Sequence, residues 1–133
     1  MEEKTILIIR DAELAALHKR PAKGLLAGMY EFPSMKGYHT AEEVKEYLAE
    51  NGLQVLRIQP LEDAKHIFSD REWHMKGYLI RVDELAPKRE GPDSADWIYI
   101  EPSETREKYP IPPAFAVYAK GLNMKLGARE NDP

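Results

Sequence analysis

One well-signalled helix, set among short strand-like segments, is the feature that most constrains this fold. Thr40 is a preferred N-cap residue, and Glu43 three positions later completes a capping box. Gly52 is the residue type that most often ends a helix. Apolar side chains fall on one side of the helix and acidic ones on another, namely Val44, Tyr47 and Leu48 against Glu42, Glu46 and Glu50. The pattern predicts a half-buried helix.

Segments rich in β-branched and aromatic residues lie on both sides of this helix. Residues 5–10 and 14–18, with a turn at Arg10-Asp11, predict a β-hairpin. Further strands are predicted at residues 54–58, 64–68, 73–82 and 97–100, a short helix at 103–108, and a last helix from Pro112-Pro113 to about 122. This order predicts an α+β fold, an α/β/α sandwich with a mixed sheet flanked by helices.

Length and composition favour one soluble domain. A chain of 133 residues with 43% hydrophobic content suits a single core, so residues 1–126 are expected to form one domain and 127–133 a disordered tail. No apolar run is long enough to span a membrane, and a cytoplasmic location is expected. The absence of cysteine excludes disulfides, thiolate nucleophiles and an iron–sulfur cluster held by this chain.

The net charge of −4 argues against a free-standing DNA-binding domain. Counterion release from phosphates supplies most non-specific affinity for DNA, and domains that exploit it are usually basic. A module tethered beside a basic partner domain escapes this objection, because the tether supplies a high effective concentration.

Residues 20–33, RPAKGLLAGMYEFP, form the most unusual run of the sequence, since their apolar residues follow neither a helical nor a strand period. The run suits a buried loop whose glycines permit positive φ. It also begins in a local basic cluster of Lys19, Arg20 and Lys23, which could face phosphates. The two interpretations are compatible.

This run, together with HIFSDREWHMKGY at 66–78 and YPIPPAFAVYAK at 109–120, resembles the C-terminal domain of the MutY family of adenine DNA glycosylases. The family usually has tryptophan where Tyr30 stands. Three motifs in the expected order are far more specific than any one of them. The resemblance covers roughly residues 4–122.

The resemblance implies a Nudix-like fold and a role in base-excision repair. In the family this domain recognises 8-oxoguanine opposite adenine, while an N-terminal domain with an iron–sulfur cluster removes the adenine. The chain is expected to be that recognition half, non-catalytic by itself, with no catalytic residue, metal or cofactor of its own. Its expected partners are duplex DNA containing 8-oxoguanine:adenine and the catalytic domain, and a monomer associated with the bacterial nucleoid is expected.

A Phe-Ser-His loop contacts the lesion in the family, and Phe68, Ser69 and Asp70 stand at the matching positions. An aromatic ring can wedge into a base step. A neighbouring hydroxyl both donates and accepts, so it can sense that N7 of 8-oxoguanine carries a hydrogen whereas N7 of guanine accepts one. The competing interpretation is that Ser-Asp-Arg is simply a polar hairpin turn.

Asp70 departs from the family, since a carboxylate only accepts hydrogen bonds and is repelled by phosphates. Either Arg71 or Lys65 compensates for the charge, or Asp70 caps the turn away from DNA. The expected contacts to the phosphate backbone are Lys19, Arg20, Lys23 and Arg71.

The acidic helix suggests a rival function, a divergent Nudix hydrolase that acts on oxidised nucleoside triphosphates with magnesium. Lys45-Glu46 and Ala49-Glu50 align with its metal-binding box, but one carboxylate of three is absent and lysine replaces arginine. The glutamates are therefore expected to form a solvated helix face. His66 and His74, on neighbouring strands, lack the further ligands of a zinc site. A protein-interaction module is the remaining alternative.

Overall fold

The computed structural model describes all residues except 13, 21, 24–26, 86–92, 105–107 and 121–133. Its elements, in chain order, are β1 (Glu2–Arg10), β2 (Ala15–Lys19), β3 (Tyr30–Glu31), β4 (Ser34–Lys36), α1 (Ala41–Glu50), β5 (Val55–Pro60), β6 (Ala64–Ile67), β7 (Glu72–Val82), η1 (Ser94–Asp96), β8 (Trp97–Ile100), η2 (Pro102–Glu104), η3 (Pro113–Phe115) and α2 (Ala116–Lys120). Among these described elements, no helix is long and apolar enough to cross a membrane.

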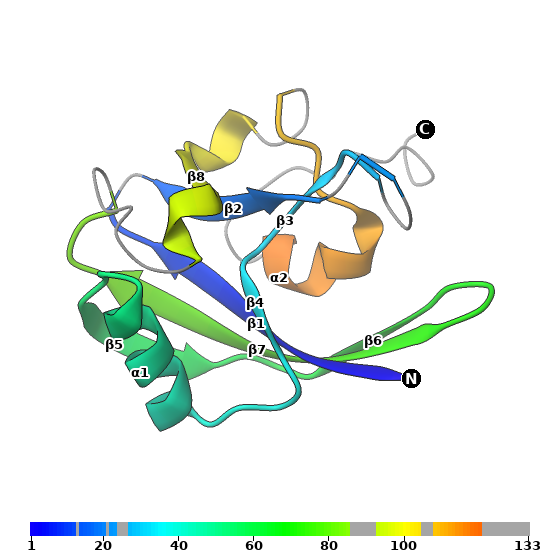
Figure 1. The fold of residues 1–133 in the computed structure, drawn as a ribbon, viewed down its shortest axis with the longest axis horizontal. Helices are drawn as coiled ribbons and strands as arrows, with labels where there is room; N and C mark the ends of the chain where they lie inside the picture. The colour runs from blue at the N-terminus through cyan, green and yellow to red at the C-terminus, as the bar shows by residue number, and fades with distance from the viewer. Residues whose placement is uncertain (13, 21, 24–26, 86–92, 105–107, 121–133) are drawn as a thin grey trace.

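The described strands form one mixed sheet in the order β3-β2-β1-β7-β5, with β4 paired to β1, β6 to β7 and β8 to β2 (Figure 1). β1 and β7 lie parallel over nine residue pairs, from Glu2↔Trp73 to Arg10↔Arg81. The long strand β7 pairs with β6 along its first part and with β5 along its last part, both antiparallel. The β6–β7 hairpin projects beyond the body of the molecule, next to the N-terminus (Figure 1).

Both faces of the central sheet are covered, because strands β1 and β7 are apolar on both sides. On one face Ile6, Ile8 and Met75 pack with the α2 residues Tyr118 and Ala119. On the other, Leu7, Ile9, Ile80 and Val82 pack with the α1 residues Val44 and Leu48. Two short helices on opposite faces of a mixed sheet confirm the predicted fold class.

Helix α2 is docked on the sheet through an aromatic ring over a glycine. A Cβ atom added at Gly77 would lie 2.3 Å from Cε1 of Tyr118, so only glycine leaves room for the ring. The Tyr118 hydroxyl donates to the carbonyl oxygens of Glu62 at 3.1 Å or Met75 at 3.3 Å. Burial raises the pKa of this hydroxyl, which therefore remains protonated as a donor.

The elements whose ends are determined by neighbouring residues match the sequence predictions. Thr40 and Glu43 form both hydrogen bonds of the capping box, and Gly52 takes the positive φ of +80° that ends α1. The predicted helix at 103–108 is described only as η2, since 105–107 lie outside the described residues. Residues 121–122 of the last helix and the predicted disordered tail, 127–133, also lie outside them.

The predicted hairpin of the first two strands is confirmed, but its pairing is short. β1 and β2 are paired only at Arg10↔Ala15, next to the turn. Beyond that point β1 pairs with β4 and β7, whereas β2 pairs with β8 and β3. Apolar alternation identifies a strand but does not select its partner, so the pairing with β4 and β8 beyond the turn could not be predicted from these residues.

Replacing Gly77 tests how α2 is held. We expect Gly77→Ala to lower the free energy of unfolding by about 1–3 kcal/mol, because the new methyl group overpacks against the Tyr118 ring. Urea unfolding followed by circular dichroism measures the change. In a Tyr118→Leu background the same substitution should cost less, and a fully additive cost would contradict the contact.

Candidate nucleic-acid interface

The turn that closes the β6–β7 hairpin presents a serine to solvent. The backbone N–H of Phe68 donates to the carbonyl of Arg71 at 2.8 Å, which closes a four-residue turn. Ser69 and Asp70 occupy its two central positions, and both are exposed. The turn therefore carries the serine at the outermost part of the molecule, where a large ligand could reach it (Figure 1).

Phe68 supports this turn from beneath. Its ring is half-buried and packs edge-on against Trp73, with centroids 4.9 Å apart, and against His66 at 4.7 Å. Insertion of this ring into a base step would require it to leave both contacts. In the conformation observed, Phe68 fixes the turn and is not an exposed wedge.

Asp70 and Arg71 lie beside each other at the end of the turn. The Nε of Arg71 is 3.8 Å from Oδ1 of Asp70, and its Nη1 is 3.7 Å from Oε2 of Glu2 at the N-terminus of β1. All three side chains are about half exposed or more, so these pairs are weak. Arg71 is thus positioned to offset the Asp70 charge, as one sequence hypothesis requires. Lys65 is exposed on the face of the hairpin opposite to the one that carries Trp73.

Two cations lie over the buried indole of Trp73, behind the hairpin. The Nζ of Lys4 is 4.2 Å from the ring centroid, and Cζ of Arg20 is 5.2 Å from it. Both distances are within the range of cation–π attraction. Burial lowers the pKa of Lys4, an effect that the nearby carboxylates Glu31 and Glu2 partly oppose.

Glu31 balances these cations. Its side chain is only 12% exposed and accepts from Nη1 of Arg20 at 2.7 Å and from Nδ1 of His18 at 3.1 Å. The side chain of Arg20 is itself only 15% exposed. Arg20 was expected to contact DNA phosphates, but in this structure it is held between a carboxylate and an indole.

The other predicted phosphate contacts remain accessible. Lys19 is exposed, with its Nζ 5.9 Å from the ring of Tyr30, and Lys23 is exposed as well. Tyr30 itself packs edge-on against Tyr109, with centroids 5.2 Å apart, so two of the three sequence motifs meet there. Positions 21 and 24–26 of the first motif lie outside the described residues.

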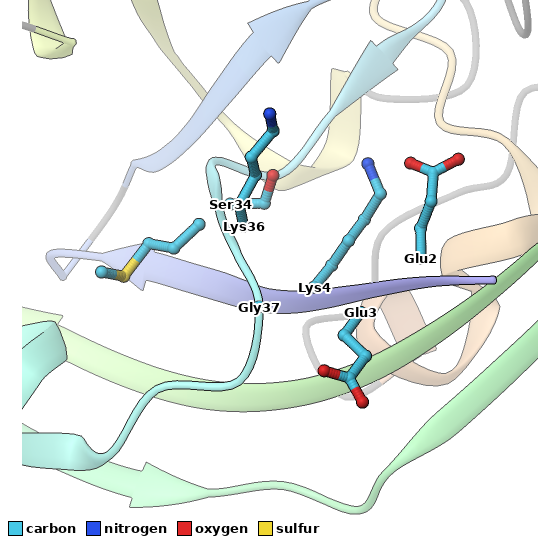
Figure 2. Close-up of a pocket in the computed structure, with 7 residues that line it drawn as sticks. Glu2, Glu3, Lys4, Ser34, Lys36 and Gly37 are labelled. Atoms are coloured by element: carbon cyan, nitrogen blue, oxygen red, sulfur yellow. The ribbon is translucent and has the colours of Figure 1, made fainter.

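A groove beside the hairpin holds a pair of lysines that sequence reasoning missed. Lys4 and Lys36 are register partners on β1 and β4, and they line a cavity of about 410 Å³ with Ser34 and Gly37. Figure 2 shows both lysines directed to the side of Glu2, whereas Glu3 lies on the opposite side of β1. The pairing joins residues 32 positions apart, so no local pattern indicates it.

The helix that suggested magnesium binding presents its carboxylates to solvent. Glu42, Glu43, Glu46 and Glu50 are all exposed, as the solvated-face interpretation predicts. Glu43 is engaged in the N-cap, whose hydrogen bonds lower its pKa. No cluster of three or more histidine, aspartate or glutamate side chains suited to a metal occurs among the described residues.

The two histidines of the hairpin do not form a pair. His66 is the register partner of Trp73, and His74 is the partner of Lys65, so their side chains leave opposite faces of the hairpin. His74 donates instead to Glu72 at 2.5 Å, which lowers the pKa of that carboxyl.

Comparison with known proteins identifies the family. The NUDIX domain model matches residues 5–120. The chain belongs to the NUDIX domain family. Within this family of folds it is similar to mouse (Mus musculus) adenine DNA glycosylase, with 33% identity over 93 residues, which covers 64% of this chain and 18% of that protein. This chain therefore spans under a fifth of the length of the relative it matches.

Solved structures give the same fold. The C-terminal domain of mouse MUTYH, determined in complex with human PCNA, superimposes with a TM-score of 0.66 at 22% identity, covering 96% of this chain and 94% of that one. The Escherichia coli ORF135 protein superimposes with a TM-score of 0.62 at 21% identity, covering 99% of this chain and 95% of that one. A MutT structure from a study of Aliivibrio salmonicida and Vibrio cholerae superimposes with a TM-score of 0.61 at 20% identity, covering 91% of this chain and 95% of that one. These solved structures confirm the Nudix-like fold. The sequence match to mouse adenine DNA glycosylase confirms the resemblance to that family.

The Arg20–Glu31 ion pair is expected to stabilise the fold beside Trp73, behind the hairpin. Arg20→Gln should lower the free energy of unfolding by about 2–4 kcal/mol, because it removes the direct cationic partner of a largely buried carboxylate. Thermal and urea unfolding measure the loss. Lys19→Gln, the same kind of change on an exposed neighbour, should stay within about 0.5 kcal/mol of the unmodified chain. Equal effects of the two substitutions would contradict the assignment.

Proposed function

We propose that this NUDIX domain is a DNA-repair module that reads 8-oxoguanine opposite adenine, while a separate catalytic domain removes the adenine. The observation that carries the proposal is the exposed Ser69 at the tip of a hairpin whose turn is closed by the Phe68–Arg71 hydrogen bond. Sequence similarity to an adenine DNA glycosylase supports a role in DNA repair. The short length matched in that relative is consistent with catalysis elsewhere.

The serine hydroxyl has the chemistry for this discrimination. 8-Oxoguanine presents an N–H at N7 where guanine presents a lone pair, and a hydroxyl can accept from the first. An exposed hydroxyl on a turn fixed from beneath can meet a base edge without rearranging the sheet. The packing of Phe68 on Trp73 thus positions Ser69 and does not itself read the base.

Phosphate contacts would come from the side of the hairpin that faces the lysine groove. Lys4 and Lys36 line this groove, and Lys19 and Lys23 extend from β2 and the loop after it. The acidic net charge limits intrinsic affinity, so the domain would act where a basic catalytic domain holds it close to DNA. Flipping of the adenine costs unstacking energy, and a grip on the opposite lesion favours the correct pair.

A nucleotide hydrolase is the second candidate, and the likeness to a MutT structure favours it. Ala49 and Lys45 stand at two positions of the metal-binding box, which leaves Glu46 and Glu50 as its carboxylates. Magnesium requires several converging oxygens, so this reduced set fits poorly. Release of pyrophosphate from an oxidised deoxyguanosine triphosphate that depends on magnesium would decide for the hydrolase.

A protein-binding role also has one supporting observation, the related mouse domain determined in complex with human PCNA. The hairpin carries Ile67 with 63% of its surface exposed, on the face opposite Phe68. Binding of a protein partner that is unaffected by lesion DNA would favour this role.

Ser69→Ala tests the proposed function directly. Loss of one hydrogen bond of about 0.5–1.5 kcal/mol should reduce the preference for 8-oxoguanine:adenine over guanine:adenine duplexes about 2- to 10-fold. Fluorescence anisotropy of both labelled duplexes at low salt measures the preference. Ser103→Ala, an exposed serine on η2, serves as the matched control. An unchanged preference in Ser69→Ala would refute the role of this hydroxyl.

Asp70→His tests the departure from the family. Removing a carboxylate beside phosphates and restoring a donor should raise affinity for the lesion duplex about 3- to 10-fold, the range of a charge-assisted contact in part-exposed surroundings. Asp63→Asn, an exposed carboxylate before β6, controls for the change in net charge. If affinity and discrimination both stay the same, Asp70 does not take part in the interface.

A further inference from the structure

Three arginines stand in a row across three adjacent strands, at the end of the sheet away from the hairpin. Arg10 on β1 is the register partner of Arg81 on β7, and Arg81 is the partner of Arg57 on β5. Register partners place their side chains on the same face of a sheet. The three side chains share the face of the sheet that carries Ile8 and Leu79. Helix α2 covers this face nearer the middle of the sheet. We call these residues the arginine row.

The row depends on an irregularity in β5. Regular pairing after Val55↔Val82 would place Leu56 opposite Arg81 and direct Arg57 into the core beside Ile80. The register instead shifts between Val55 and Arg57, so Arg57 stands opposite Arg81. Such β-bulges re-aim side chains and are frequent beside functional sites. The bulge thus brings a third guanidinium onto the face where two already lie.

Like charges in direct register are destabilising, so the row needs an explanation. Among the described residues, none of its three guanidinium groups forms an ion pair, although Nε of Arg10 donates to the carbonyl of Asp11 at 3.4 Å. The nearby carboxylates bind backbone amides: Asp11 accepts from Leu14 and Leu85, and Asp83 accepts from Glu84. These two carboxylates stay negatively charged, but no ion pair among the described residues joins either of them to an arginine of the row.

The surroundings of the row are open and suited to a flexible anion. The arginines line a groove of about 420 Å³ with Leu56, Gln59 and Leu79. Arg57, Arg81 and Gln59 are exposed, and Arg10 is half-buried. Neighbouring strands are about 4.8 Å apart, so three Cα atoms span about 10 Å, and guanidinium groups bind phosphate oxygens in a forked geometry. A stretch of closely spaced phosphates matches this arrangement.

We propose that the arginine row binds the phosphate backbone of nucleic acid as a second contact surface, separate from the hairpin. Trp73 and Arg81 lie eight positions apart on β7, which is about 26 Å along the strand. The row would hold DNA without reading its bases, as phosphate contacts do. The choice of DNA as the anion rests on the proposed function.

The surface can be located by nuclear magnetic resonance. The ¹⁵N-labelled chain is titrated with a short undamaged duplex at low salt, and the arginine Nε–Hε signals are followed. Signals of Arg10, Arg57 and Arg81 should shift, whereas that of Arg20, whose largely buried side chain is held through Nη1 by Glu31, should not. Absence of shifts at the row overturns the proposal, as do larger shifts with a poly-glutamate peptide than with the duplex.

Salt dependence gives the second measurement. Each phosphate contact contributes about 0.9 to the slope of log affinity against log salt, so the double substitution R57Q/R81Q should reduce the slope by about 1.8. Arg81→Lys, which keeps the charge, should retain most of the slope. Lys45→Gln removes a charge from α1, on the opposite face, and should not change it. A slope unchanged in R57Q/R81Q overturns the proposal.

The two proposals fail separately. If an 8-oxoguanine duplex shifts the arginine row but not the amide of Ser69, the second surface stands and lesion reading by the hairpin fails. If Ser69 shifts and the row does not, the reverse holds.

Discussion

The parallel pairing of β1 with β7 is the constraint on which the rest of the structure depends. Nine consecutive residue pairs hold these strands at the centre of the sheet, and both strands bury side chains on both faces. A shift by one residue would turn the side chains that pack with α2 toward α1 and the reverse, so the close packing of both clusters fixes the register. The same register sets the position of Lys4 over Trp73 at one end of the pair and of Arg10 beside Arg81 at the other.

Sequence reasoning succeeded where the physics is local. A capping box satisfies backbone donors within one helical turn, and Gly52 ends α1 through its own φ, so both can be read from adjacent residues. The hairpin turn around Ser69 is equally local, closed by the Phe68–Arg71 hydrogen bond. The family resemblance then supplied the overall fold, because three motifs in order carry information about packing that a single segment lacks.

The interactions that shape the surface are non-local, and the sequence did not indicate them. Arg20 read as a surface cation because nothing nearby in the sequence showed that Glu31 and Trp73 would enclose it. Nothing in the sequence assigned a role to Asn51, whose buried side chain accepts from the backbone amides of Asp93 and Ser94 and so connects α1 to the segment before β8. Both depend on which strands and loops meet, a choice that alternation alone leaves open.

The distance in sequence between β1 and β7 also bears on how the chain acquires its fold. The paired residues lie roughly seventy positions apart, and contacts of such long range make folding slow, because loop closure must be achieved before pairing stabilises the chain. During synthesis the apolar residues 6–9 emerge before β7 and must wait for this partner strand. A chain ending before residue 72 would lack the centre of its sheet, so a nascent or truncated product would expose an aggregation-prone strand.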